Sequence, residues 1–283
     1  MAEPPALVRL SPAHVGERHG GGSLERAGEL LATYGPLVLL GAMAVGYIVL
    51  VLHDRNQRHW PPARPVLFVI GVVLMATALS PPVDSWADAD FGGHMVQHLL
   101  LGMVGPLALV LGAPATLLLR GLPHRHARGL GRLLNTGAVH RLTQPAVALG
   151  LSSGGLVLLY LTPLYDLSTR HDGIHLLVHV HLVLAGILFA WVIAGPDPGP
   201  RRASVRTRLV VLGISIIVHA SVSQLLYAGV LVQVHEPVEQ MRAAGSLMYF
   251  GGDIAELLLA LALLVTWRPP AAKPRSQRHV SLA

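Results

Sequence analysis

Seven long apolar segments are the feature of this sequence that most restricts how the chain can fold. A helix that crosses a bilayer needs roughly 20 mostly apolar residues, and most of these segments approach or exceed that length. They run over Tyr34–Leu52, Pro65–Leu79, His94–Leu119, Pro145–Thr162, Ile174–Ala194, Leu209–Val232 and Ala244–Trp267. We therefore expect an all-α membrane protein, built as a bundle of seven transmembrane helices.

Composition agrees with this expectation. Only 13% of the residues are charged, against about 25% in soluble globular domains. The formal charge of +6 could indicate nucleic acid as a partner, but the basic residues lie in the loops and tails outside the spans, mostly on one side, as in ordinary membrane proteins. We therefore expect the lipid bilayer as a partner and no nucleic acid. The chain has no cysteine, which excludes disulfides and thiolate metal ligands.

The third apolar segment is long for one straight span and contains Pro106 and Pro114. Proline in a helix interior removes a backbone hydrogen bond and kinks or ends the helix. Two interpretations follow. The span is kinked throughout, or it ends near Leu111 and is followed by a short interfacial helix.

The distribution of Lys and Arg predicts the orientation, because cytoplasmic loops carry an excess of both. Of the 21 basic residues, 16 fall on one side of the expected bundle and five on the other. This bias predicts an N-terminus outside and a C-terminus in the cytoplasm. Together with the apolar segments, this orientation predicts three parts of the chain. They are an N-terminal extracytoplasmic tail (1–33), a seven-helix transmembrane domain (34–267) and a cytoplasmic basic tail (268–283).

Histidines gather where the third and fifth segments begin. His94 and His98 are four residues apart, and so are His175 and His179, with His181 close behind. Residues i and i+4 share a helix face, so each pair can point in one direction. The predicted orientation places both pairs near the outer surface of the membrane.

The sixth and seventh segments add ionisable groups at His219, Asp253 and Glu256. Such groups are costly inside a bilayer, usually face the protein interior and often mark a function. Imidazoles and carboxylates are ligands for copper or zinc, and copper(I) also accepts methionine. The stretch "PPVDSWADAD" before His94 is expected to be an acidic loop that attracts cations.

Other interpretations remain open at this stage. A single histidine in a span is often only a hydrogen-bonded packing residue. Haem needs two axial ligands from different helices, and His98 with His179 could supply them in a b-type haem protein. His219, Asp253 and Glu256 could instead form the relay of a metal or proton transporter. A zinc protease is excluded because Met95 occupies the position after the first histidine where such enzymes carry a catalytic glutamate.

Three stretches resemble signature segments of the multi-spanning CtaG-like cytochrome c oxidase assembly factors of bacteria. They read "HMVQHLLLGMVGPLALVLGAP", "IHLLVHVHLVLAGILFAWVIAGPDP" and "GSLMYFGGDIAELLLALAL", and they occur in the family's order. The similarity covers roughly residues 34–267.

The resemblance implies a multi-pass protein of the bacterial plasma membrane that helps to assemble an aa3- or caa3-type oxidase and is not an enzyme. It implies oxidase subunits as partners and delivery of copper as the role, with haem or zinc as other possible cofactors; a homodimer stays open. The residue pattern and the resemblance together predict His94, His98, His175 and His179 as metal ligands, with His181, His219 and Asp253 as secondary candidates.

Overall fold

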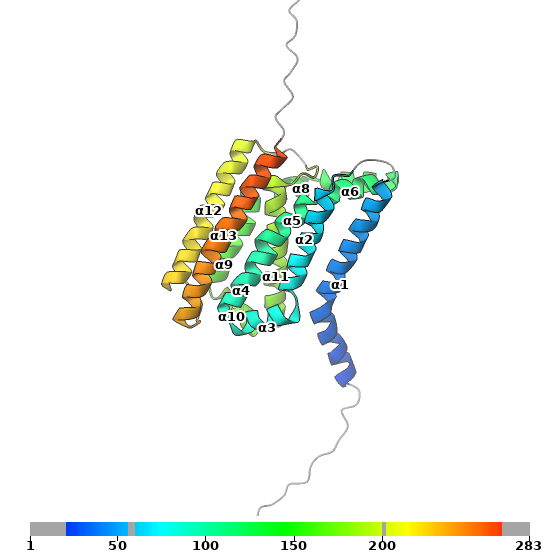
Figure 1. Cartoon of the computed structure of the whole chain (residues 1–283). Helices are drawn as coiled ribbons and strands as arrows, with labels where there is room; N and C mark the ends of the chain where they lie inside the picture. Colours follow the sequence, from blue (N-terminus) through cyan, green and yellow to red (C-terminus); the bar gives the residue numbers. More distant parts are fainter. Residues whose placement is uncertain (1–20, 56–59, 200–201, 268–283) are drawn as a thin grey trace, which may run out of the picture.

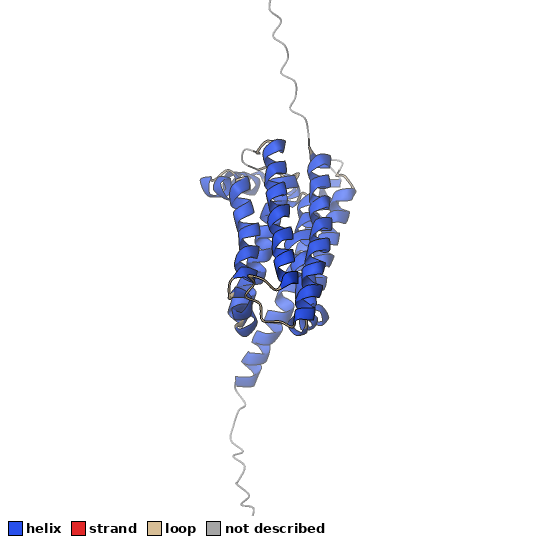
Figure 2. Cartoon of the chain, turned by 90° about the vertical axis from the view of Figure 1, so that its left-hand side faces the viewer, coloured by secondary structure: helices blue, strands red, loops and turns tan. Residues whose placement is uncertain are grey.

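The structure is a computed structural model, and it describes residues 21–55, 60–199 and 202–267. These residues form a bundle of helices, most of which run side by side (Figures 1 and 2). The helices are α1 (Gly21–Arg55), α2 (Ala63–Ala78), α3 (Pro81–Ala89), α4 (Phe91–Leu99), the π-helical turn η1 (Leu100–Val104), α5 (Gly105–Leu111), α6 (Pro114–Gly121), α7 (His124–Leu134), α8 (Gly137–Leu142), α9 (Pro145–Leu161), α10 (Leu164–Arg170), α11 (Asp172–Ala194), α12 (Val205–Ala228) and α13 (Val238–Thr266). The described residues contain no strand.

Up to seven of these units can cross a membrane, which confirms the predicted class. Five spans are long and apolar enough by themselves, one of them continuous from α4 to α6. Two more are helix pairs bent at a short break, α2 with α3 by 51° and α9 with α10 by 78°. The orientation of the bundle in a membrane stays a prediction.

The third apolar segment follows the second of its two interpretations. After α5 ends at Leu111, Ala113 adopts a left-handed backbone conformation with φ of 54°. The chain then turns into α6, which lies across the end of the bundle near α1 (Figure 1). Proline is favoured in the first turn of a helix, and Pro106 and Pro114 begin α5 and α6 in this way.

Several boundaries differ from those predicted. The expected acidic loop before His94 is instead the helix α3, started by prolines at its first positions. The sixth span ends at Ala228 and not at Val232, because Gly229 takes the left-handed conformation that terminates helices. The seventh begins at Val238, earlier than predicted. Within the predicted N-terminal tail, residues 21–33 form the first part of α1. Residues 1–20 and the basic tail 268–283 lie outside the described residues.

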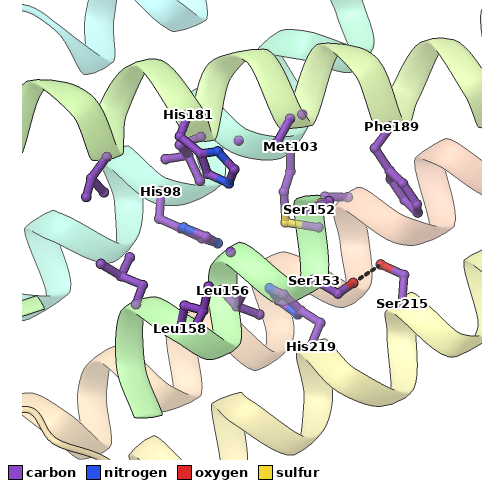
Figure 3. A pocket seen from close by; sticks show the side chains of 18 of the residues that line it. His98, Met103, Ser152, Ser153, Leu156, Leu158, His181, Phe189, Ser215 and His219 are labelled. Carbon is purple, nitrogen blue, oxygen red and sulfur yellow. Dashed lines mark hydrogen bonds between the residues drawn. The ribbon is translucent and has the colours of Figure 1, made fainter. Parts of the chain in front are cut away.

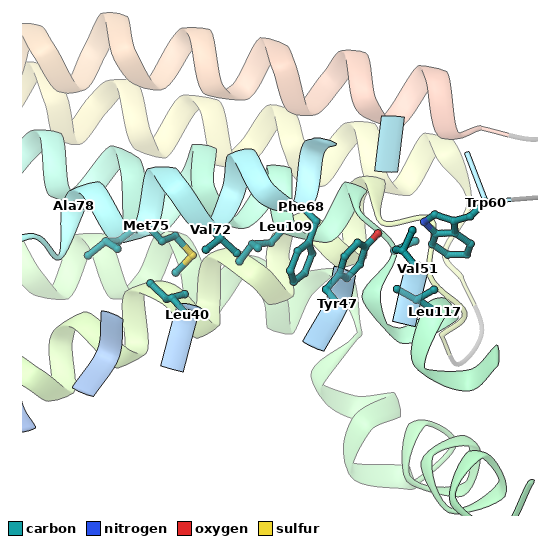
Figure 4. Packing of buried hydrophobic residues seen from close by; sticks show 12 residues of the cluster. Leu40, Tyr47, Val51, Trp60, Phe68, Val72, Met75, Ala78, Leu109 and Leu117 are labelled. Carbon is teal, nitrogen blue, oxygen red and sulfur yellow. The ribbon is translucent and has the colours of Figure 1, made fainter. Parts of the chain in front are cut away.

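One hydrophobic cluster attaches α1 to the rest of the bundle (Figure 4). The rings of Tyr47 and Phe68 are stacked with centroids 3.9 Å apart. The Tyr47 hydroxyl donates a 2.6 Å hydrogen bond to the carbonyl of Gly112, which satisfies that carbonyl at the end of α5. Gly71 of α2 allows close contact with α5, since a Cβ there would lie 2.7 Å from the Leu109 nitrogen. These contacts hold α5 in place. Because α5 follows directly after α4 and η1, they also help to position His94 and His98 on α4.

Candidate metal centre

The predicted ligands come from four helices that pack against one another. His94 and His98 lie on α4, His175, His179 and His181 on α11, His219 on α12, and Asp253 with Glu256 on α13. The structure divides them into two groups. We name His94, His175 and His179 the terminal group, and His98, His181, His219 and Glu256 the cavity group.

The terminal group lies at the end of the bundle that α3 and α10 cover (Figure 1). His175 and His179 are in edge-to-face contact, with ring centroids 4.3 Å apart. Both are within electrostatic range of His94, and Asp84 of α3 is within range of His179. The His94 ring also packs against Tyr165, with centroids 5.0 Å apart. All three histidines are half-buried, so this group is accessible from its end of the bundle.

Asp84 is held in place by the helix that carries the first histidine pair. The Gln97 side-chain nitrogen donates to Asp84 at 3.0 Å and to the carbonyl of Ala78 at 2.9 Å. Asp90 caps α4 by accepting from the Gly93 nitrogen at 3.1 Å. Aspartate is a preferred cap because its carboxylate satisfies a free backbone N–H at the helix start. The acidic residues predicted to form a loop therefore have specific structural partners.

The cavity group lines a largely apolar cavity of about 330 Å³ among α4, α9, α11, α12 and α13 (Figure 3). His98 and His219 are 5% and 6% exposed, and their ring centroids lie 6.3 Å apart with planes inclined by 17°. Met103 reaches the same cavity. The lining also includes the exposed residues Leu158 and Leu177, so the cavity extends to the bundle surface between α9 and α11.

Glycines of the neighbouring helices make room for two of the imidazoles. The His219 ring lies against the backbone of Gly252, where any Cβ would collide with it. A Cβ at Gly155 would lie 2.5 Å from Nε2 of His181. The same His181 nitrogen contacts the carbonyl of Leu151 at 3.1 Å, so His181 already has a protein partner.

Four of the polar side chains that the sequence singled out have buried atoms with no hydrogen-bond partner among the described residues. These atoms are Nε2 of His94, Nδ1 of His98, Nε2 of His219 and both carboxylate oxygens of Glu256. Buried polar atoms almost always have partners, so such exceptions need an explanation, and an ion that they bind is one. Asp253 is half-buried and within electrostatic range of both His219 and Glu256.

The predicted ligands are not assembled into one centre. Among the described residues, no group of three or more histidine, aspartate or glutamate side chains has an arrangement that could hold a metal ion. Of the methionines near these histidines, only Met103 lines the cavity, and Met95 and Met248 lie elsewhere in the bundle. Met95 accepts a hydrogen bond from the Tyr160 hydroxyl at 3.7 Å, and Met248 is fully buried in the core.

Two features of the cavity and its surroundings were not foreseen from sequence, and the first of them, Tyr160, lies outside the cavity lining. Tyr160 is fully buried and lies beside His98, with ring centroids 6.2 Å apart. Ser153 and Ser215 meet across the cavity wall at 3.4 Å (Figure 3). Serine and tyrosine are common in membrane helices, and only their convergence from α9 and α12 distinguishes these residues.

Comparison with known proteins identifies the family. The family described as "Cytochrome c oxidase caa3 assembly factor" matches residues 45–269. The chain belongs to this family. The resemblance inferred from the three signature segments is therefore confirmed.

The curated relatives are mycobacterial and uncharacterised. An uncharacterised protein of Mycobacterium leprae (strain TN) is 33% identical over 197 residues, which are 64% of this chain and 29% of the relative. Uncharacterised proteins of Mycobacterium bovis and Mycobacterium tuberculosis are each 30% identical over 230 residues, covering 78% of this chain and 32% of the relative. The chain thus spans about a third of the length of the relatives it matches. No solved structure matches.

Proposed function

We propose that this member of the assembly-factor family handles copper as cargo, without catalytic turnover, and delivers it to a subunit of the oxidase in a bacterial plasma membrane. The observation that carries the proposal is the set of unpartnered polar atoms on His94, His98, His219 and Glu256, inside a bundle whose buried residues are mainly apolar. An assembly factor for a copper-containing oxidase has a reason to keep imidazoles free.

The two groups suit two stages of transfer. The half-buried terminal group receives an ion from outside the bundle, with the Asp84 carboxylate attracting it. The cavity group then holds the ion between His98 and His219. A metal–imidazole bond is about 2 Å long, so rings on opposite sides of one ion have centroids roughly 6 Å apart. The observed 6.3 Å agrees with that spacing.

The cavity chemistry favours copper(I) over zinc. Copper(I) is a soft ion that tolerates few ligands and accepts the Met103 thioether, whereas zinc is usually held by four ligands in a tetrahedral arrangement. His98, His219, Met103 and Glu256 together offer four donors, so the preference for copper(I) rests on the soft thioether and not on the number of ligands. His181 and Asp253 are assigned supporting roles in this proposal, since His181 is already bonded to Leu151 and Asp253 contacts the cavity group only electrostatically.

Copper(I) competition with a chromogenic chelator, on protein purified anaerobically in detergent, tests the proposal. We expect wild-type protein to retain copper and His98→Gln/His219→Gln to lose it. The matched control is His124→Gln/His126→Gln, which removes two exposed histidines of α7. Equal copper retention in all three proteins refutes the ligand assignment. A Soret absorbance band in the freshly purified wild-type protein would identify a haem protein instead.

A further inference from the structure

A second cavity lies at the opposite end of the bundle from α3 and α10. It is a groove of about 1150 Å³ bounded mainly by α2, α5 and α13. Its wall is aliphatic, with Ile70 and Leu74 of α2 on one side and Leu258 and Leu261 of α13 on the other. All but Leu74 are well exposed, so the groove faces outward from the bundle. Its volume exceeds the roughly 300–1,000 Å³ of ordinary small-molecule sites.

Four arginines close one end of this groove. They are Arg64 of α2, Arg120 of α6, Arg202 of the segment before α12, and Arg208 of α12. None of the described residues that line the groove is acidic. Four positive charges thus stand at the head of an otherwise aliphatic channel, and this end carries the basic loops expected to be cytoplasmic.

The two nearby carboxylates, Asp54 and Asp197, offset only part of the charge of the four arginines. Asp54 lies 3.8 Å from Arg120 as its ion-pair partner. Asp197 accepts bonds from the nitrogens of Ala115 and Thr116 at 3.0 and 2.7 Å, which commits it to the start of α6. Arg202 donates to the backbone carbonyls of Gly195 and Asp197. Burial lowers the pKa of Arg202 and the Asp197 charge opposes that shift, but an arginine remains protonated at neutral pH.

Two further observations point to an anionic group at this end. Arg208 is only 6% exposed, and its Nε is buried with no partner among the described residues, while its terminal nitrogen donates to the Ile193 carbonyl at 2.8 Å. The 24-residue helix α12 also begins here, with Ser204 and Val205 on the groove wall. A helix N-terminus presents backbone N–H groups and positive potential, which favours phosphate. At α12 the Ser204 hydroxyl already accepts from the Thr207 nitrogen, so the positive potential is the main contribution of this helix end.

We propose that this groove binds an anionic glycerophospholipid of the cytoplasmic leaflet. The acyl chains lie along the aliphatic wall of α2 and α13, and the phosphate is held by the arginines. Basic pockets between transmembrane helices on the cytoplasmic side recognise such headgroups, and the arginine fork matches phosphate oxygens. A helix of a partner protein would fill the aliphatic channel but would leave the positive charge that Asp54 and Asp197 do not offset without a counter-charge.

Native mass spectrometry of the full chain with phosphatidylglycerol, cardiolipin or phosphatidylcholine tests the proposal. We expect the two anionic lipids to be retained and phosphatidylcholine to be lost. Arg64→Gln/Arg120→Gln is expected to weaken anionic-lipid binding about thirtyfold, given the contribution of each arginine near an anionic lipid. The matched control Arg125→Gln/Arg132→Gln, which removes two exposed arginines of α7, is expected to leave binding unchanged.

A second pair of variants keeps every charge. Leu261→Trp narrows the groove and should reduce lipid retention, whereas Leu257→Trp, one turn away and outside the lining, should not. Equal loss in the two arginine variants would show general surface attraction and overturn the proposal. Displacement of the lipid by millimolar inorganic phosphate would also overturn the proposal. That result would show that the arginines bind phosphate and that the acyl chains add nothing to the affinity. Crosslinking of this groove to an oxidase subunit in native membranes with no lipid bound would overturn the proposal too.

Discussion

The terminal group and the buried pair His98/His219 of the cavity group use the same side chain in different environments. His94 and His98 are one turn apart on α4, yet His94 packs with Tyr165 beside the half-buried pair His175/His179, whereas His98 is 5% exposed and faces His219 across an apolar cavity. An imidazole near water exchanges ligands easily, because water can replace whatever leaves. An imidazole in an apolar cavity has no such substitute and holds its ligand longer. The difference suggests that the groups differ in rate and in affinity, and this can be tested.

The largest effect is expected from emptying the cavity group. His98→Gln/His219→Gln should weaken copper(I) binding by at least about a hundredfold, since changes to groups that merely support ligands already cost about 10–100-fold. His175→Gln/His179→Gln should instead slow copper uptake and change the equilibrium affinity little. Stopped-flow uptake and chelator competition measure the two quantities separately. If the two double variants have the same profile, the two-stage comparison is wrong.

A smaller effect is expected from displacing His219 without removing it. In Gly252→Ala the new methyl group must occupy the space of the His219 ring. Overpacking costs about 1–3 kcal/mol, and we expect copper affinity to fall about tenfold through the shifted ring. Gly154→Ala is the control, because a Cβ at Gly154 meets nothing within 4 Å. Thermal unfolding followed by copper titration distinguishes a shifted ligand from an unfolded protein, and equal affinity in both variants would contradict the placement of His219.

Glu256→Gln tests whether the cavity carboxylate balances the charge of bound copper or only lowers the stability of the fold. Both Glu256 oxygens are buried without partners, and a buried unsatisfied group costs about 1–3 kcal/mol, more when it is charged. Replacing it with a neutral amide should raise the melting temperature of the copper-free protein by a few degrees, roughly 2–4 °C for each kcal/mol. The copper-loaded protein should gain less if Glu256 balances the charge of the ion. A lower melting temperature in both states would show that Glu256 has a stabilising partner.

The smallest effect is expected at the entrance. Asp84→Asn removes one charge near His179 but preserves an oxygen that can accept the Gln97 bond. Copper uptake at low ionic strength should slow roughly two- to threefold and become less sensitive to salt, because a surface charge acts mainly on encounter rates. The equilibrium affinity should not change. An unaltered rate at low salt would remove Asp84 from the uptake path.

The sequence by itself determined the class of the protein and its family. Apolar length alone indicates helices that span a membrane, because backbone hydrogen bonding inside a bilayer has few solutions. The prolines predicted either a kink or an end to the third span, and the structure has the end, between Leu111 and Pro114. The i, i+4 spacing also placed His94 with His98, and His175 with His179, on shared helix faces. The prediction of a loop before His94 was wrong, because prolines at the first positions of this segment begin the helix α3.

Only the tertiary structure decided which histidines meet. Spacing along one helix cannot tell that His98 faces His219 on α12, or that Gly252 leaves room for that ring, since both depend on how α4, α12 and α13 pack. The same holds for the arginine-lined groove, whose four cations come from separate segments and look like ordinary loop charges in the sequence. Helix formation is governed by neighbours along the chain, whereas convergence of side chains is governed by packing between segments distant in the chain.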